Sequence, residues 1–259
     1  MLKNYQPISN LPFLSKIFEK VILHQLLAHL QENNFCNPLQ SAYPTGHSTE
    51  PALLQVVNDL LTAMDEDKIS VLLLLDLSAT FVTIDHQILL SRLKIVFGIR
   101  STALQWFWSY LLDRNQSIVV NNSASSLFPL MFVVPKGLVL GPVLSVLYTT
   151  PLSDIIASHS VNHQLFAADT QLQKLTPPNN VRSLTSYLQL CTDGIKSWMC
   201  SSQLKLSEDK TEAILFSKLS LPSDCLPSPV TVGTHQLHSL TNLGTWGSSS
   251  ALTIQWNNM

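Results

Sequence analysis

Two apolar segments that each end in an aspartate place the strongest constraint on this fold. Residues 71–75 are all valine or leucine and lead directly into Asp76. A second apolar stretch, far along the chain, ends at Ala168 and Asp169. A carboxylate at the end of a buried strand is unfavourable unless a cation neutralises it. Two such strand ends, brought together by the fold, could hold divalent ions.

Composition indicates a folded, globular chain of 259 residues, with 46% hydrophobic and 12% charged residues. Lysine and arginine total 15 against 17 acids, so the net charge of -2 gives no overall attraction to nucleic acid. Nucleic-acid binding would need a local basic groove. The four cysteines have no C-x-x-C spacing, which is typical of a reducing compartment. The cytoplasm or nucleus is expected, because the N-terminus lacks the apolar core of a secretion signal.

Apolar residues that recur every three or four positions predict helices. The helices are expected over about residues 12–31, 86–97, 101–112, 140–158 and 180–200. A further helix is expected up to Met64, with Ser48 or Thr49 as its N-cap. Buried or alternating stretches predict strands over about 69–77, 116–121, 127–134 and 211–217, and a hairpin over 163–174 that bends around Ala168 and Asp169. Beyond Lys218, serines, prolines and a lack of periodicity predict a poorly packed tail.

Three further patterns are given structural interpretations. The apolar stretch from Leu127 to Tyr148 contains prolines and Lys136, so we interpret it as a buried turn and helix and expect no membrane segment. The aromatic residues of 101–112 favour core packing over base stacking. His159 and His163 have an H-x-x-x-H spacing, but no nearby cysteine or acidic partner completes a zinc site, so none is expected.

A series of short motifs occurs in a fixed order along some 210 residues. The motifs occupy residues 4–11, 40–43, 47–50, 75–77 with Phe81, 85–86, 135–137, 140–142, 166–171, 205–206 and 209–212. Together they resemble the reverse transcriptase domain of LINE-type, non-LTR retrotransposons. The resemblance implies an α+β fold, the fingers and palm of a right-hand polymerase, with an antiparallel palm sheet backed by helices. Residues 1–217 would form fingers and palm, and residues 218–259 a poorly ordered tail in place of a thumb.

The resemblance also implies a metal site. The family's palm holds two Mg²⁺ ions with three carboxylates, which activate the primer 3′-hydroxyl and stabilise the leaving pyrophosphate. By this resemblance Asp76 is the first catalytic carboxylate, followed by Leu77 at the metal site, and Asp169 is the last. Ala168 stands at the middle position and has no ligand to offer. Taken alone, Asp76 would more often be a salt-bridged strand end and Asp169 a turn residue, but the other motifs favour the metal site.

Nucleotide binding is assigned by the same resemblance to Phe81, Lys136, Gly137 and Lys210. Phe81 would pack beneath the sugar of the incoming nucleotide, although core packing is an equal alternative. Lys136 and Gly137 replace a glutamine-glycine turn that touches template and nucleotide. Lys210 matches a lysine near the triphosphate, although an exposed lysine is more often simply solvated.

The implied activity is RNA-directed DNA synthesis by two-metal nucleotidyl transfer, with an RNA template, a DNA primer and deoxynucleoside triphosphates as partners. Several departures predict that this activity is impaired: Ala168 lacks a carboxylate, and Gln6 and Pro44 replace basic residues that would bind phosphate. The alternative is a non-catalytic remnant of a retroelement with at most weak RNA binding. The oligomeric state is left open.

Overall fold

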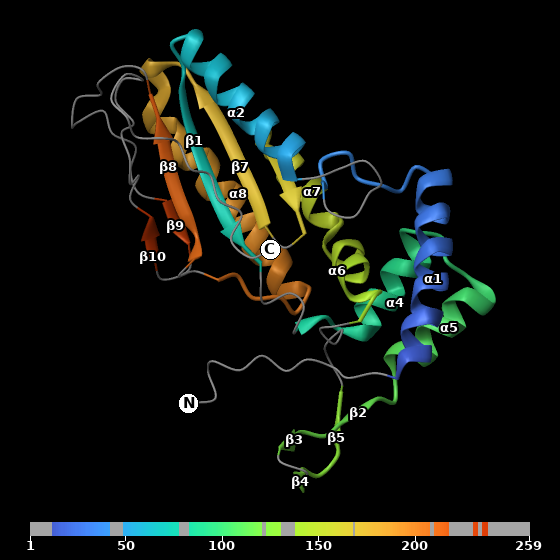
Figure 1. Cartoon of the computed structure of the whole chain (residues 1–259). Helices are drawn as coiled ribbons and strands as arrows, with labels where there is room; N and C mark the ends of the chain where they lie inside the picture. Colours follow the sequence, from blue (N-terminus) through green and yellow to red (C-terminus); the bar gives the residue numbers. More distant parts are fainter. Residues whose placement is uncertain are drawn as a thin grey trace. The chain divides into compact units, whose positions relative to one another are not determined.

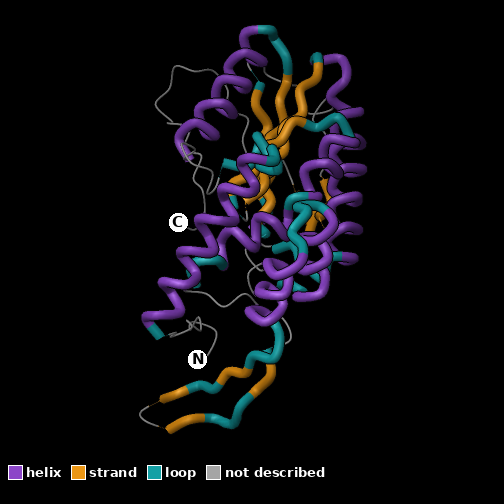
Figure 2. Tube along the Cα trace, turned by 90° about the vertical axis from the view of Figure 1, so that its right-hand side faces the viewer, coloured by secondary structure: helices purple, strands orange, loops and turns teal. Residues whose placement is uncertain are grey.

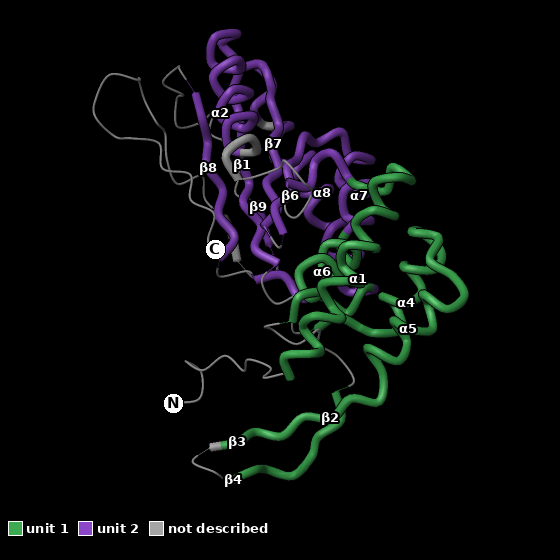
Figure 3. The backbone as a smooth tube through the Cα atoms, turned by 45° about the vertical axis from the view of Figure 1, so that its right-hand side comes forward, with its two compact units in different colours: residues 1–36, 79–149, 202–204 green, residues 37–78, 150–201, 205–259 purple. Residues whose placement is uncertain are grey.

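The computed structural model describes residues 12–41, 49–77, 83–120, 123–130, 138–167, 169–207, 210–217, 230–232 and 235–237. The chain divides into two compact units, which Figure 3 distinguishes by colour. Unit 1 comprises Met1–Cys36, Ala79–Thr149 and Ser202–Leu204. Unit 2 comprises Asn37–Ser78, Thr150–Ser201 and Lys205–Met259.

Unit 2 is built on a four-stranded sheet with the order β6-β7-β1-β8. The strands are β1 (Ile69–Asp76), β6 (Asn162–Phe166), β7 (Asp169–Thr176) and β8 (Glu212–Phe216), and each neighbouring pair is antiparallel. Helices α2 (Thr49–Asp65) and α8 (Val181–Ser201) cover opposite faces of this sheet (Figures 1 and 2). Because both faces are covered, β1 can be apolar along nearly its whole length.

The core of unit 2 forms on both sides of the central strand. Leu72 of β1 packs with Val56 and Leu60 of α2 and with Phe216 of β8. The buried residues of α8 include Leu184, Leu188, Cys191 and Ile195, which recur at helical spacing. Helix α7 (Pro151–Ser158) packs against α8 and β6. The core therefore fixes β1 in the middle of the unit and leaves its last residue, Asp76, at the end of the sheet.

Unit 1 is mainly helical, with α1 (Phe13–Glu32), α4 (His86–Ile95), α5 (Ser101–Leu111) and α6 (Gly141–Thr149). The Asp85 carboxylate caps α4 by accepting the N–H groups of Gln87 and Ile88 at 2.8 and 2.9 Å. Gly98, with a φ of 65°, follows the end of that helix. Between α5 and α6 an extended arm contains two-residue ladders, β2 (Asn115–Gln116) with β5 (Phe128–Pro129) and β3 (Val119–Val120) with β4 (Ser123–Ala124).

The structure corrects two predicted elements. The helix expected over 140–158 is two helices, because Pro151 lacks an N–H and its ring would clash with the carbonyl four residues earlier in a continuous helix. The strands expected over 116–121 and 127–134 are only two-residue ladders among the described residues, since the arm is exposed and buries no apolar face.

The tail beyond Lys218 contains structure that the sequence analysis did not predict. Of residues 218–259, the structure describes 230–232 and 235–237, and these form the antiparallel strands β9 (Val230–Val232) and β10 (His235–Leu237). Gln189 of α8 holds β9 by accepting the Thr231 N–H at 2.8 Å and donating to the Thr231 carbonyl at 3.0 Å. Val230 and Val232 are buried.

The aromatic helix α5 is only partly a core element. Phe107 and Leu111 are buried, as core packing requires, while Trp108 is about half exposed. Trp106 stacks on Tyr110 with ring centroids 5.0 Å apart.

Among the described residues, no helix is both long and apolar enough to cross a lipid bilayer.

Candidate active site

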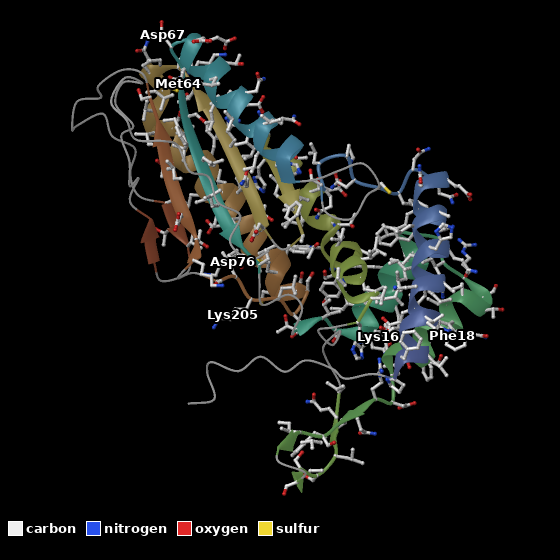
Figure 4. All side chains as sticks on the ribbon, in the orientation of Figure 1. Lys16, Phe18, Met64, Asp67, Asp76 and Lys205 are labelled. Carbon is white, nitrogen blue, oxygen red and sulfur yellow. The ribbon has the colours of Figure 1, made fainter. Side chains whose placement is uncertain are left out.

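The strand register of unit 2 brings the two predicted acids together. Asp76, the last residue of β1, pairs directly with Asp169, the first residue of β7. Residues that face each other in an antiparallel pair have Cβ atoms about 4.5 to 5.5 Å apart. Asp76 is labelled in Figure 4 at the end of β1. Two segments 93 residues apart in the sequence thus place their carboxylates at one end of one sheet.

A tight hairpin holds Asp169 in this position. Phe166 of β6 pairs with Asp169 of β7, so only residues 167 and 168 connect the strands. Ala167 has a φ of 51°, the left-handed conformation that two-residue hairpin turns favour. The Ala167 N–H donates to the side-chain oxygen of Gln40 at 3.0 Å. The turn is therefore supported from outside the hairpin.

Gln40 is a supporting residue to which the sequence analysis gave no role. Its side chain is buried, and its backbone lies beside Leu165 of β6 in a parallel bridge. The flanking hydrogen bonds run from the Leu165 N–H to the Leu39 carbonyl at 2.8 Å and from the Ser41 N–H to the Leu165 carbonyl at 2.9 Å. The motif at 40–43 was the only sequence signal for this support.

Lys210 is the cationic partner of the first acid. Its Nζ lies 3.1 Å from Oδ2 of Asp76, and the side chains are 48% and 6% exposed, respectively. The backbone near Lys210 is tied to the same strand end, because the Ser207 N–H donates to the Asp76 carbonyl at 3.1 Å. The Lys210 N–H in turn donates to the Ser207 carbonyl at 3.2 Å. The segment before β8 thus delivers a flexible ammonium to a buried carboxylate.

The electrostatics of the pair favour a cation. Burial first, and then the charge of the neighbouring Asp76, raise the pKa of Asp169 to about 6, with Lys210 acting in the opposite direction. Burial disfavours the charged form of Asp169, and the neighbouring negative charge adds to that effect. Additional positive charge at this end of the sheet would stabilise the ionised form of Asp169.

The donor set suits a hard divalent cation, because such ions prefer carboxylate and carbonyl oxygens. Asp76 and Asp169 supply carboxylates, and Leu77 could offer only its backbone carbonyl. Within the described part of the chain, no group of three or more His, Cys, Asp or Glu side chains converges to hold a metal. Asp76 and Asp169 therefore bring two carboxylates, and at most two negative charges, to this end of the sheet.

The remaining predicted site residues are not all placed. Phe81, Lys136, Gly137 and Ala168 lie outside the described residues. His163, which the sequence analysis did not assign to a zinc site, is buried and shares a 2.7 Å hydrogen bond with the Ser153 hydroxyl.

An antiparallel sheet backed by helices, with one acid at the end of its central strand and another at an adjacent hairpin, defines the palm of a nucleic-acid polymerase. Residues 2–246 match the family model described as reverse transcriptase (RNA-dependent DNA polymerase), and the chain belongs to that family. The family predicted from the sequence motifs is thereby confirmed.

Curated relatives come from mobile elements of flies. The RNA-directed DNA polymerase from mobile element jockey of Drosophila melanogaster is 29% identical over 220 residues, covering 83% of this chain and 24% of that protein. The probable RNA-directed DNA polymerase from transposon BS of the same species is 29% identical over 236 residues, covering 88% of this chain and 25% of that protein. The chain thus spans about a quarter of the length of these relatives.

Solved structures of telomerase share the fold. Apo telomerase from Candida tropicalis, truncated from its C-terminal domain, matches with a TM-score of 0.55 at 12% identity, covering 86% of this chain and 42% of that one. Telomerase from Candida albicans, in complex with a fragment of telomeric RNA, matches with a TM-score of 0.54 at 11% identity, covering 84% and 37%. At such identities the likeness concerns the fold alone, and the predicted α+β fingers-and-palm class is confirmed.

Proposed function

We propose that this chain carries the fingers and palm of a retrotransposon reverse transcriptase and that its site for nucleotidyl transfer is strongly impaired. The observation that carries the proposal is the direct pairing of Asp76 with Asp169 at the end of the sheet. The expected substrates are an RNA template, a DNA primer and deoxynucleoside triphosphates. Membership of the family supports these partners.

The residues have distinct roles in this proposal. Asp76 and Asp169 are the carboxylates that would hold divalent cations, with Mg²⁺ expected, and Leu77 would contribute its carbonyl. When bound, such ions activate the primer 3′-hydroxyl and stabilise the leaving pyrophosphate. Lys210 would contact the triphosphate, since its ammonium lies within reach of the same carboxylate end. Phe81 would pack beneath the sugar, and Lys136 and Gly137 would contact template and nucleotide.

The impairment follows from the residue before Asp169. A methyl group at Ala168 cannot replace a carboxylate that offsets part of the four positive charges of two divalent ions. Removing one preorganised electrostatic group typically costs about 3 to 4 kcal/mol in the transition state, near a thousandfold in rate. Loss of a metal ligand should cost at least as much.

Primer extension on an RNA template, with Mg²⁺ or Mn²⁺, tests the proposal. The unaltered chain should give almost no product, whereas Ala168→Asp should increase synthesis by about a hundredfold or more. Ala168→Asn is the matched control. Asparagine is similar in size to aspartate but carries no charge, so this variant should recover little DNA synthesis. Robust synthesis by the unaltered chain would contradict the impairment. A folded Ala168→Asp variant with no synthesis would contradict the assignment of the site.

A non-catalytic role in RNA binding is the second candidate, favoured by the missing carboxylate at position 168. The net charge of -2 opposes tight binding. A mobility-shift titration with single-stranded RNA at rising salt tests this candidate, because RNA binding through phosphate contacts produces a steep loss of affinity as salt rises. No shift at low salt would remove this candidate.

A further inference from the structure

The ion pair between Lys210 and Asp76 has a second consequence for the site. The Asp76 carboxylate is almost fully buried, and the Lys210 ammonium approaches its Oδ2 at 3.1 Å. The same carboxylate is the one that the proposed function assigns to a divalent cation. Lysine and metal therefore compete for one acid.

The geometry allows the lysine to leave. The backbone at Lys210 is held by contacts that do not involve its ammonium: the Lys210 N–H and the Thr211 hydroxyl both donate to the Ser207 carbonyl, at 3.2 and 2.9 Å. These contacts hold the backbone without the ammonium. The Lys210 side chain is about half exposed. Its flexible aliphatic stem can carry the ammonium into solvent. Breaking the ion pair therefore does not require the backbone at Lys210 to unfold.

The two cations would repel each other if both stayed. A divalent ion on a carboxylate lies about 2.0 to 2.6 Å from its oxygen. An ammonium that kept its distance of 3.1 Å from the same oxygen would then lie only a few ångströms from the metal. Two positive charges at so short a distance repel each other strongly at the edge of a protein, because the screening there is weaker than in bulk water.

Charge counting makes this competition important in this chain. Asp76 and Asp169 together carry two negative charges when ionised, and Lys210 offsets one of them. A third carboxylate at position 168 would leave more negative charge for a cation, but Ala168 provides none. The lysine therefore neutralises half of the charge that the two acids can offer.

We propose that Lys210 is the resident counter-ion of Asp76 and that it lowers the affinity of the site for divalent cations, which must displace its ammonium to bind. The inference rests on the proposed function in taking Asp76 and Asp169 as the metal ligands. Beyond the proposed function, Lys210 is inferred to have two positions. Its ammonium lies either against Asp76 or in solvent, where it can contact the phosphate of a bound nucleotide. Binding of a divalent cation to Asp76 moves it from the first position to the second.

Isothermal titration of the full chain with Mn²⁺, without nucleotide or primer, tests the inference. Lys210→Gln should bind Mn²⁺ about tenfold more tightly than the unaltered chain, because the competing charge is gone. Lys210→Arg, which keeps the charge, should retain the weaker affinity. Adding Asp76→Asn to Lys210→Gln should remove the gain, since the gain depends on that carboxylate.

Lys205 provides the matched control for charge. It is an exposed lysine on the segment that follows α8, and Figure 4 labels it at the same end of unit 2 as Asp76. Lys205→Gln removes the same charge without removing the ion-pair partner, so it should change Mn²⁺ affinity by less than about twofold, as expected for a solvated charge.

The outcomes separate this inference from the proposed function. Equal Mn²⁺ affinity in the unaltered chain and Lys210→Gln would overturn the competition while leaving the metal site intact. An equal gain from Lys205→Gln would also overturn it, because a general field would then explain the effect. Absence of Mn²⁺ binding that depends on Asp76 in every variant would overturn the inference and the metal site together.

Discussion

Two buried carboxylates, one in each unit, are compensated in different ways. Glu19 of α1 is 2% exposed, and its Oε2 accepts the N–H groups of Val139 and Leu140 at 2.6 and 3.2 Å. Asp76 of β1 is 5% exposed and faces the flexible ammonium of Lys210. One acid is held by the backbone and the other by a side chain that can leave.

The difference separates a structural acid from an acid suited to binding. Backbone N–H groups cannot move away without unfolding the segment that carries them, so Glu19 fastens α1 to the start of α6. Burial, followed by the charge of Glu19, raises the pKa of the nearby Tyr110 hydroxyl, which favours its neutral form. Asp76 instead lies beside a second acid, Asp169, and a displaceable partner. Only the second arrangement can exchange its counter-ion for a ligand.

The largest expected effect comes from removing the structural acid. Glu19→Ala would leave the buried N–H of Leu140 and the part-buried N–H of Val139 without this acceptor, and it should reduce the free energy of unfolding by about 3 kcal/mol. Chemical denaturation measures the loss. Glu32→Ala, at the exposed end of the same helix, is the control and should change stability by less than about 0.5 kcal/mol. Equal effects of the two substitutions would remove the distinction between a buried and an exposed acid on α1.

His163 is a third buried ionisable group, and its side chain is hydrogen-bonded to the neutral hydroxyl of Ser153. Burial lowers the pKa of His163, with the Val161 carbonyl and Asp154 acting in the opposite direction. The folded chain therefore takes up this proton at lower pH than the unfolded chain, whose histidine titrates near 6.5. Stability due to neutral His163 is complete above about pH 6.5 and is lost as pH falls through and below that value.

His163→Gln should weaken this acid sensitivity. Denaturation midpoints measured between pH 8 and pH 5 should fall more for the unaltered chain than for His163→Gln. Other groups titrate in both proteins, so the difference between the two profiles reports on this residue. Parallel profiles would show that His163 does not contribute.

A smaller effect is expected at the acid suited to binding. Asp76→Asn removes an ion pair in which only the side chain of Lys210 is exposed, and it also removes the repulsion between Asp76 and Asp169. Because these two effects oppose each other, the free energy of unfolding should change by less than about 1 kcal/mol. The measurement is made in the presence of a chelator, so that no metal contributes. A loss as large as that of Glu19→Ala would break the comparison, because both acids would then be structural.

An effect of similar size concerns the turn that positions Asp169. Ala167 has a φ of 51°, a conformation that glycine adopts without steric conflict, so Ala167→Gly should raise stability by up to about 1 kcal/mol. The same substitution at the exposed Ala157 in α7 should lower stability by about 0.5 to 1 kcal/mol. Thermal denaturation of both variants checks the opposite signs. A loss at position 167 would mean that the turn is not strained.

Much of the fold was predictable because its signals are local. The continuous apolar run of β1 identified a buried strand, and Gly98 marked the region where α4 ends. The break between α6 and α7 also had a local signal in Pro151, but apolar periodicity on both sides of it favoured one long helix. Strand β9 had little local signal, because Gln189, 42 residues away in sequence, holds it in place.

The site was predictable only in part. Motif order placed Asp76 and Asp169 in one site, and the strand register brings them together. The ion pair of Lys210 with Asp76 and the support of the hairpin by Gln40 are tertiary contacts between distant segments, so no spacing rule could specify them. Residues 81, 136, 137 and 168 lie outside the described part of the chain, and their assigned roles stay predictions.

The division into two units has a consequence for how such a sequence can be dissected. The polypeptide passes from one unit to the other five times, after residues 36, 78, 149, 201 and 204. Neither unit is therefore encoded by an uninterrupted stretch of gene. A deletion or exon loss that extends over one of these passages removes parts of both, so neither unit could be inherited or expressed as a self-contained module.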